Sequence, residues 1–249
     1  RHWMHQIRVN RFVYASVIDE LCREAGVSIR LHEMPASVEE RGDHRALVVA
    51  GKTGLGAILT QKIVDATGDA NVAHLMGYPL QVSEAMQPGT LAYQLSGYDI
   101  DKIDKDALQR LADEAVREGR LLPTDFRNRR PPLWAELSGG GGNAMHVVDI
   151  DGTTSPGRTD AELKAREGLS RIYNFLRTVP GCENIQVSYF ANECGVRDTR
   201  RIVGEAQITV DRYRSGYVWP DAVCYSFYPI DVHVKGAIDT RPLAEGVVP

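Results

Sequence analysis

The chain has 249 residues, of which 29 are Lys or Arg, 33 are Asp or Glu and 43% are hydrophobic. This length is enough for one large domain or two small ones with a packed core. A net charge of −4 and a pI near 6.0 give no electrostatic basis for binding nucleic acid or an anionic membrane. The apolar runs are also far shorter than the ~20 residues of a membrane-spanning helix. We therefore expect neither a nucleic-acid partner nor a membrane partner.

The cysteines and histidines do not form a recognisable framework. The four cysteines are widely scattered, with no Cys-x-x-Cys pair, at Cys22, Cys182, Cys194 and Cys224. This pattern favours a reducing compartment, so we expect a cytoplasmic protein. His2 and His5 have a spacing that can hold a metal on a helix, but no acidic residue or cysteine nearby completes a site. We predict no metal ligands.

The first third of the sequence predicts alternating helices and strands. Residues 10–25 repeat Val13, Val17 and Leu21 on one helical face, and Gly26 follows as a C-terminal cap. Short apolar runs predict strands at 27–31, which Met34-Pro35 ends, and at 46–50 and 55–60, with a hairpin turn at 51–54. A further strand is expected at 62–65, followed by a turn and a helix at 70–76. The order indicates an α/β arrangement.

The rest of the sequence predicts an α+β part, with the boundary near residues 78–88. Periodic apolar residues indicate helices at 104–119 and 161–179, separated by a loop-rich stretch at 120–142. Alternating patterns predict strands at 90–96, 184–192, 201–210 and 222–228. Residues 149–152 resemble the start of a calcium loop, but Thr153, Thr154 and Ser155 replace the later acidic ligands, so we expect a turn.

Two segments stand out as candidate functional sites. In the first, Ala66, Thr67 and Gly68 follow the strand expected at 62–65, so small residues leave the backbone accessible at the end of that strand. An ordinary strand-to-helix turn is the alternative. In the second, Arg197, Arg200 and Arg201 lie within five residues. Guanidinium groups this close repel one another unless an anion or carboxylates face them. A structural ion-pair network remains the alternative.

Three ordered motifs resemble those of a known family. The sequence contains Ile63-Val-Asp-Ala-Thr-Gly-Asp69, Gly195-Val-Arg-Asp-Thr-Arg-Arg-Ile202 and Tyr228-Pro-Ile-Asp-Val-His233. FAD-dependent oxidoreductases with a glutathione-reductase-like FAD fold contain close counterparts, with Glu in the usual place of Asp198. The resemblance extends over residues 5–235. It implies an α/β fold, with a partial FAD-binding Rossmann-like domain at 1–80 and an inserted α+β substrate domain at 81–249.

The resemblance also implies a cofactor and site residues. FAD would lie along Ala66, Thr67, Gly68 and Asp69, and hydride would pass between the flavin and a small organic substrate. Arg197 and Arg200 are then candidates for holding an anionic group. His146 and His233 are candidate proton carriers, because imidazole titrates near neutral pH.

The sequence departs from the family pattern at both ends. The opening Gly-x-Gly-x-x-Gly strand, which holds the FAD pyrophosphate at a helix N-terminus, is not in the sequence. The closing segment of the flavin site is also missing from it. The chain therefore reads as an internal fragment of a longer flavoprotein, inactive when alone. The alternative is a non-catalytic binding or scaffold domain that retains the fold without a cofactor.

Overall fold

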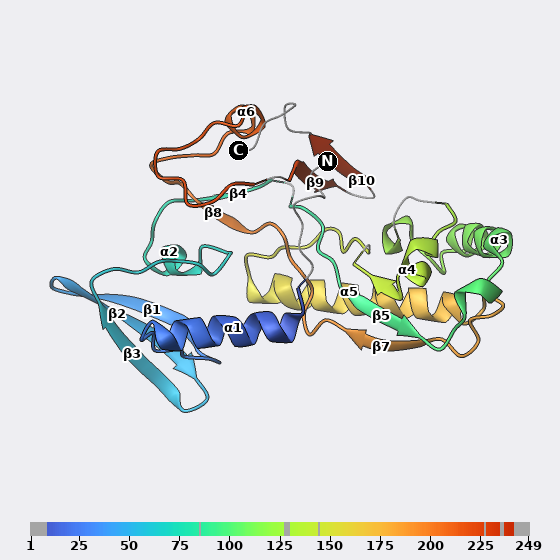
Figure 1. Cartoon of the computed structure of the whole chain (residues 1–249), viewed down its shortest axis with the longest axis horizontal. Helices are drawn as coiled ribbons and strands as arrows, with labels where there is room; N and C mark the ends of the chain where they lie inside the picture. The colour runs from blue at the N-terminus through green and yellow to red at the C-terminus, as the bar shows by residue number, and fades with distance from the viewer. Residues whose placement is uncertain are drawn as a thin grey trace. The chain divides into compact units, whose positions relative to one another are not determined.

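The computed structural model describes residues 9–84, 86–126, 130–143, 145–226, 228–234 and 237–241, the side chains after 232 excepted. The chain divides into two compact units, whose helices and strands are labelled in Figure 1. The first unit contains residues 1–81 and 201–230, together with 242–249. The second unit contains residues 82–200 and 231–241. Residues 201–230, which lie between the two parts of the second unit in sequence, therefore belong to the first.

The first unit begins with α1 (Arg11–Glu24), as the periodicity predicts. Asn10 caps the helix, because its side-chain oxygen accepts hydrogen bonds from the backbone N–H groups of Phe12 at 3.0 Å and Val13 at 3.2 Å. Gly26 follows the helix with φ +73°, a left-handed conformation that glycine adopts without strain. No residue of α1 is buried.

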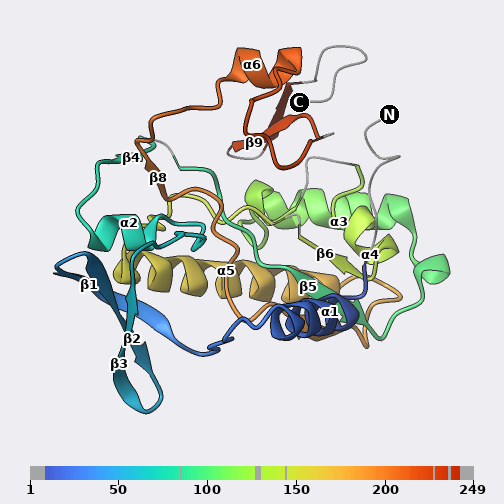
Figure 2. The ribbon, with the colours of Figure 1, turned by 60° about the vertical axis from the view of Figure 1, so that its left-hand side comes forward.

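An antiparallel three-stranded sheet follows, in the order β1 (Met34–Arg41), β2 (His44–Gly51) and β3 (Gly54–Thr60). The predicted hairpin is confirmed, since Gly51 pairs with Gly54 across a two-residue turn. Ala46 and Val49 of β2 are buried. The short helix α2 (Asn71–Leu75) packs against β1, as Figure 2 shows.

The remaining elements of the first unit lie close to its boundary or in the returning segment. The strands β4 (Leu80–Val82) and β8 (Arg200–Ile202) pair with each other where the chain passes between the units. Helix α6 (Val210–Ser215) follows β8 and is capped by Thr209. The hydroxyl of Thr209 accepts a hydrogen bond from the N–H of Arg212 at 3.3 Å.

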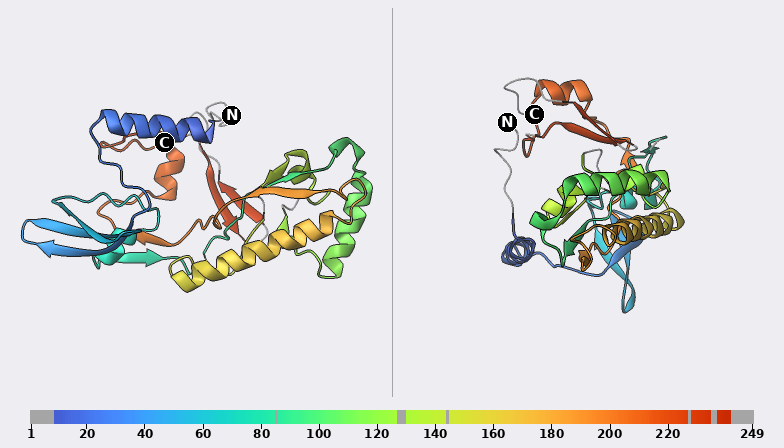
Figure 3. Two further views of the ribbon diagram at one scale, coloured as in Figure 1. Left: turned by 90° about the horizontal axis from the view of Figure 1, so that it is seen from below. Right: turned by 90° about the vertical axis from the view of Figure 1, so that its right-hand side faces the viewer.

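The second unit is built on a small sheet and a long helix. The sheet has the order β6 (Gly141–Gly142), β5 (Tyr93–Ser96) and β7 (Gln186–Phe190). Helix α5 (Ser155–Leu176) runs along the β5–β7 pair (Figure 3). The other elements are α3 (Lys105–Arg117), α4 (Trp134–Ser138), β9 (Ile230–Val234), β10 (Ala237–Arg241) and 3-10 helices at Ile100–Lys102 and Pro123–Asp125.

The main hydrophobic core lies in the second unit. Small residues on α5, including Ala161, Ala165 and Gly168, let neighbouring segments approach the helix closely. An added Cβ at Gly168 would lie 2.6 Å from the sulfur of Met145, so glycine lets this side chain pack directly on the helix backbone. The largest fully buried side chains of this core are Leu91, Leu108, Leu121, Leu133, Leu137, Met145, Ile172 and Leu176.

Three predicted strands are wrong in the residues that the structure describes. Residues 27–31, 62–65 and 222–226 are not strands. Their apolar side chains are largely exposed, with Val64 at 90% and Val223 at 97%. An extended segment needs a neighbouring strand to satisfy its backbone groups, and none of these three segments pairs with one.

Other boundaries also differ from the expectation. The strand predicted at 201–210 ends at Ile202, and Thr209 near its predicted end caps α6 instead. Strand β1 begins at Met34, where a strand end was expected, and its polar sequence gains stability by pairing with β2. Helix α5 begins six residues earlier than predicted, at Ser155, after the cap Thr154.

The observed structure is a mixture of helices and strands, consistent with the α/β prediction. All four cysteines are free. In the part of the chain that the structure describes, no helix is both long enough and apolar enough to cross a membrane. The same part contains no cluster of side chains suited to a metal ion.

A buried ion pair connects the 3-10 helix at Pro123–Asp125 to α5. Asp125 is 2% exposed and its carboxylate accepts two hydrogen bonds from the Arg171 guanidinium, at 2.9 Å and 2.7 Å. The backbone N–H of Leu122 donates a third, at 2.9 Å. The pKa of Arg171 is raised, chiefly by this hydrogen-bonded contact with Asp125.

We predict that Asp125→Ala lowers the free energy of unfolding by about 3 kcal/mol, because Arg171 is left without its carboxylate in a partly buried site. Asp113→Ala is the matched control. It breaks an exposed ion pair with Arg130 and should cost about 1 kcal/mol or less. Denaturant unfolding of both variants measures the difference. An equal decrease in the free energy of unfolding for both variants would show that the Asp125–Arg171 pair stabilises the fold no more than an exposed ion pair.

Candidate functional site

The carboxylate of Asp65 organises the turn that joins residues 62–65 to α2. One carboxylate oxygen accepts hydrogen bonds from the N–H of Thr67 at 3.1 Å and its hydroxyl at 2.7 Å. The other accepts from the N–H groups of Val72 at 2.9 Å and Ala73 at 3.0 Å. The Thr67 hydroxyl in turn accepts from the N–H of Asn71 at 3.0 Å. The turn and the first residues of α2 are therefore held by one side chain.

These contacts also determine the ionisation of Asp65. Partial burial is the largest single influence and raises the pKa, but the hydrogen bonds from Ala73, Thr67 and Val72 together outweigh it. The pKa of Asp65 is therefore lowered. A carboxyl with a lowered pKa in the folded state contributes stability above its unfolded pKa, and this contribution is lost as the pH falls through the folded value.

The turn leaves its backbone open. Ala66, Thr67 and Gly68 are exposed, and Asp69 is half-buried. Gly68 has φ +81°, and an added Cβ there would meet no atom within 4 Å. The bend is therefore not covered by neighbouring side chains, and a flat ligand can approach its main chain directly.

The structure changes the chemical interpretation of this turn in two respects. The Thr67 hydroxyl is engaged within the turn, donating to Asp65 and accepting from Asn71. The N–H groups of Val72 and Ala73 already donate to Asp65, so they do not offer a phosphate cradle. Sequence reasoning did not single out Asp65. Its position two residues before a threonine and seven before a helix was the available signal.

The arginine segment, residues 194–200, is anchored in the second unit by backbone contacts. Gly195 and Thr90 exchange two backbone hydrogen bonds, at 2.7 Å and 3.1 Å. The N–H of Cys194 donates to the Glu162 carboxylate at 2.5 Å. Thr199 is buried. Strand β8 begins at Arg200, so residues 196–199 of the segment are not part of a strand.

The arginine segment packs on the turn that begins α5. The Asp151 carboxylate accepts from the N–H of Thr153 at 2.8 Å and its hydroxyl at 2.6 Å, as expected for a turn. An added Cβ at Gly152 would lie 2.5 Å from a methyl of Val196 and 2.8 Å from that of Thr199. Glycine at 152 therefore permits the close approach of the arginine segment.

The predicted arginines have different environments. Arg200 donates to the carbonyl of Thr153 and its charge helps to lower the pKa of Asp151, after the larger effect of the Thr153 hydrogen bonds. Arg197 is exposed and forms no hydrogen bond or ion pair with another described residue. Arg200 thus has the structural role that the alternative interpretation of the arginine cluster gives it. The charge of Arg197, by contrast, is available to a ligand.

The two predicted histidines belong to the second unit. His146 is half-buried, and its backbone N–H donates to the carbonyl of Thr124 at 2.7 Å. His233 lies in β9, with its side chain outside the described residues. The catalytic roles assigned to His146, His233, Arg197 and Arg200 stay predictions, as does the cofactor role of residues 66–69.

We predict that Asp65→Ala loosens the turn and the start of α2, because three N–H groups lose their acceptor. Hydrogen exchange of the amides of Thr67, Val72 and Ala73 should become faster, with a loss of local stability on the order of 1–3 kcal/mol. Asp65→Asn keeps one acceptor oxygen and should have an intermediate effect. Unchanged exchange in Asp65→Ala would contradict the assigned role.

Comparison with known proteins identifies the family of this chain. A family model described as FAD dependent oxidoreductase matches residues 1–246. No curated protein matches the chain. A solved structure, from structural and functional studies of BexE and of oxidation during BE-7585A biosynthesis, is similar with a TM-score of 0.42 and 13% identity, over 78% of this chain and 35% of that one. The chain thus spans about a third of the length of that protein. Because the family model matches almost every residue, the chain belongs to the FAD dependent oxidoreductase family.

Proposed function

We propose that the protein containing this chain transfers hydride between a small organic substrate and FAD. The first unit would form part of a Rossmann-like FAD-binding domain, and the second unit would be the inserted substrate domain. Membership of the family supports FAD as the cofactor. The observation on which the proposal depends most is the exposed turn at 66–68, held open by the Asp65 carboxylate.

The residues of this turn fit a nucleotide-type cofactor through main-chain contact. Their side chains are small, and the space beside Gly68 is free of protein atoms within 4 Å of an added Cβ. The Asp65 hydrogen bonds keep the turn in one conformation, so little ordering entropy is lost when a ligand binds. The α2 amides are already occupied, so the turn would contact the cofactor without supplying its phosphate site.

When bound, FAD supplies the hydride chemistry, and the chain positions the reacting groups. Arg197 extends from an anchored backbone and has no partner among the described residues. Its guanidinium would hold an anionic group of the substrate, or stabilise negative charge that develops during reduction. Arg200 would act indirectly, by fixing the arginine segment to the turn before α5. His146 and His233 would carry protons.

We predict that Ala66→Leu reduces flavin binding, because the larger side chain would cover the exposed turn. In the full-length protein, the flavin content per protein should fall by about tenfold, measured from the visible absorbance of the purified protein. Ala57→Leu places the same substitution on an exposed position of β3 and should leave the flavin content unchanged. Equal flavin content in both variants would remove the turn from the cofactor site.

The same spectrum tests the class of protein. A full-length protein that is colourless and gains no flavin absorbance with added FAD would contradict the oxidoreductase proposal. It would favour the alternative of a non-catalytic domain that retains the fold without cofactor.

We predict that Arg197→Ala slows flavin reduction by roughly a hundredfold, because the site loses its unpaired cation. The measurement is anaerobic reduction of the bound flavin by a panel of organic donors, followed by absorbance. Arg197→Lys retains the charge and should recover part of the rate. The exposed Arg120→Ala is the control. Reduction of Arg197→Ala at the wild-type rate by every active donor would show that Arg197 does not act in the reaction.

A further inference from the structure

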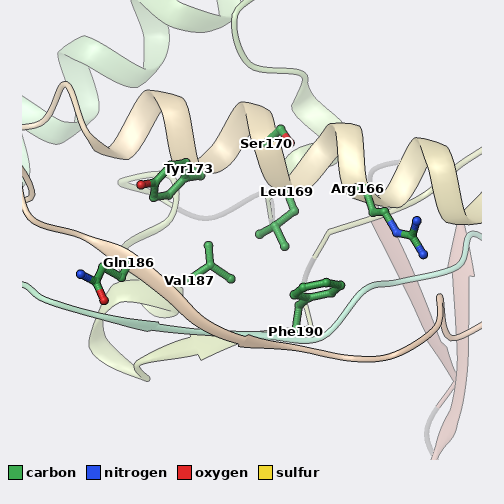
Figure 4. A pocket seen from close by; sticks show the side chains of 7 residues that line it. All are labelled: Arg166, Leu169, Ser170, Tyr173, Gln186, Val187 and Phe190. Atoms are coloured by element: carbon green, nitrogen blue, oxygen red, sulfur yellow. The ribbon is translucent and has the colours of Figure 1, made fainter.

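A groove in the second unit lies between α5 and the edge strand β7, and none of its lining residues is a predicted site residue. From α5, Leu169 points toward β7, and Val187 and Phe190 point back from β7 toward the helix (Figure 4). The cavity measures about 650 Å³, within the range of small-molecule sites. Its lining residues are Arg166, Leu169, Ser170, Tyr173, Gln186, Val187 and Phe190.

The groove lies at the margin of the core, since Leu169 belongs to the core cluster and also lines the groove. Arg166, Leu169, Ser170 and Tyr173 recur at helical spacing along one stripe of the helix. The core-facing stripe contains fully buried residues such as Ile172. Phe190 remains 44% exposed, although its ring lies over apolar neighbours. An apolar body placed in the groove would bury this ring and the side chain of Val187.

The polar groups of the groove favour an anion. Arg166 is the one charged residue of the lining, and its side chain is 55% exposed. Its contact with Glu162 is long, at 3.6 Å, and that carboxylate already accepts a hydrogen bond from the Cys194 N–H at 2.5 Å. The Gln186 amide has no hydrogen-bond partner among the described residues. The Arg166 guanidinium can therefore donate hydrogen bonds to a ligand carboxylate without giving up a strong contact.

A second guanidinium, which is not part of the lining, lies near the ring of Tyr173. The Arg177 guanidinium is 5.8 Å from the centre of the Tyr173 ring. Figure 4 shows Tyr173 and Gln186 at the end away from Arg166. The lining thus contains one positive charge, that of Arg166, and no acidic residue. This arrangement disfavours organic cations.

We propose that this groove binds a small organic carboxylate with an aromatic or branched apolar body. The carboxylate pairs with Arg166, and the body lies on Leu169, Val187 and Phe190. The inference goes beyond the proposed hydride transfer, because it assigns a ligand to residues that the proposed reaction does not use.

The test measures binding of naphthoate and of its neutral analogue naphthamide to the full-length protein by isothermal titration calorimetry. Naphthoate should bind more tightly than naphthamide. Arg166→Gln should weaken naphthoate by about tenfold and leave naphthamide unchanged. Phe190→Ala should weaken both ligands, because it removes apolar contact. Arg110→Gln, on the exposed face of α3, is the matched control and should alter neither affinity.

The proposal would be overturned if naphthoate did not bind, if it bound no better than naphthamide, or if Arg166→Gln matched Arg110→Gln. Circular dichroism verifies that each variant is folded, and Phe190→Ala provides a second, charge-independent measure of the same groove. Flavin content is measured in the same samples. Binding in a flavin-free protein would support the groove while contradicting the oxidoreductase proposal, so the two can fail independently.

Discussion

The Asp65 carboxylate is the constraint on which the rest of the account depends. It accepts hydrogen bonds from both polar groups of Thr67 and from two N–H groups at the start of α2. Without this side chain the main chain at 66–68 would have many conformations, and an exposed backbone would offer no defined surface. With it, small side chains and a left-handed glycine produce a bare and ordered turn. A cofactor that binds through main-chain contact requires both properties.

The second unit contains the same aspartate–threonine contact at a different kind of turn. Asp151 accepts hydrogen bonds from the N–H and the hydroxyl of Thr153, two residues later, as Asp65 does with Thr67. There the turn begins the long helix α5, and Gly152 lets the arginine segment pack directly on it. The positions of Arg197 and Arg200 thus depend on a short-range aspartate–threonine contact and one glycine. Similar local chemistry therefore shapes both candidate sites, one in each unit.

Local patterns predicted the elements that local interactions determine. Helices α1, α3 and α5, which show an apolar periodicity, and the β2–β3 hairpin follow from side chains within a few residues. The wrong strands at 27–31, 62–65 and 222–226 have a common cause, since pattern alone cannot show whether a pairing strand exists. The candidate segments were identified by motif. The role of Gly152 depends on contacts with Val196 and Thr199, which are distant in sequence, and the role of Asp65 depends on where α2 begins.

The central claim is that the turn held by Asp65 lies against the flavin nucleotide. The most direct measurement is an experimental structure of the full-length protein with FAD bound. The account predicts that the backbone of Ala66, Thr67 and Gly68 contacts the cofactor, with the Asp65 hydrogen bonds intact. A structure in which FAD binds elsewhere, with this turn covered by protein or facing solvent, would contradict it.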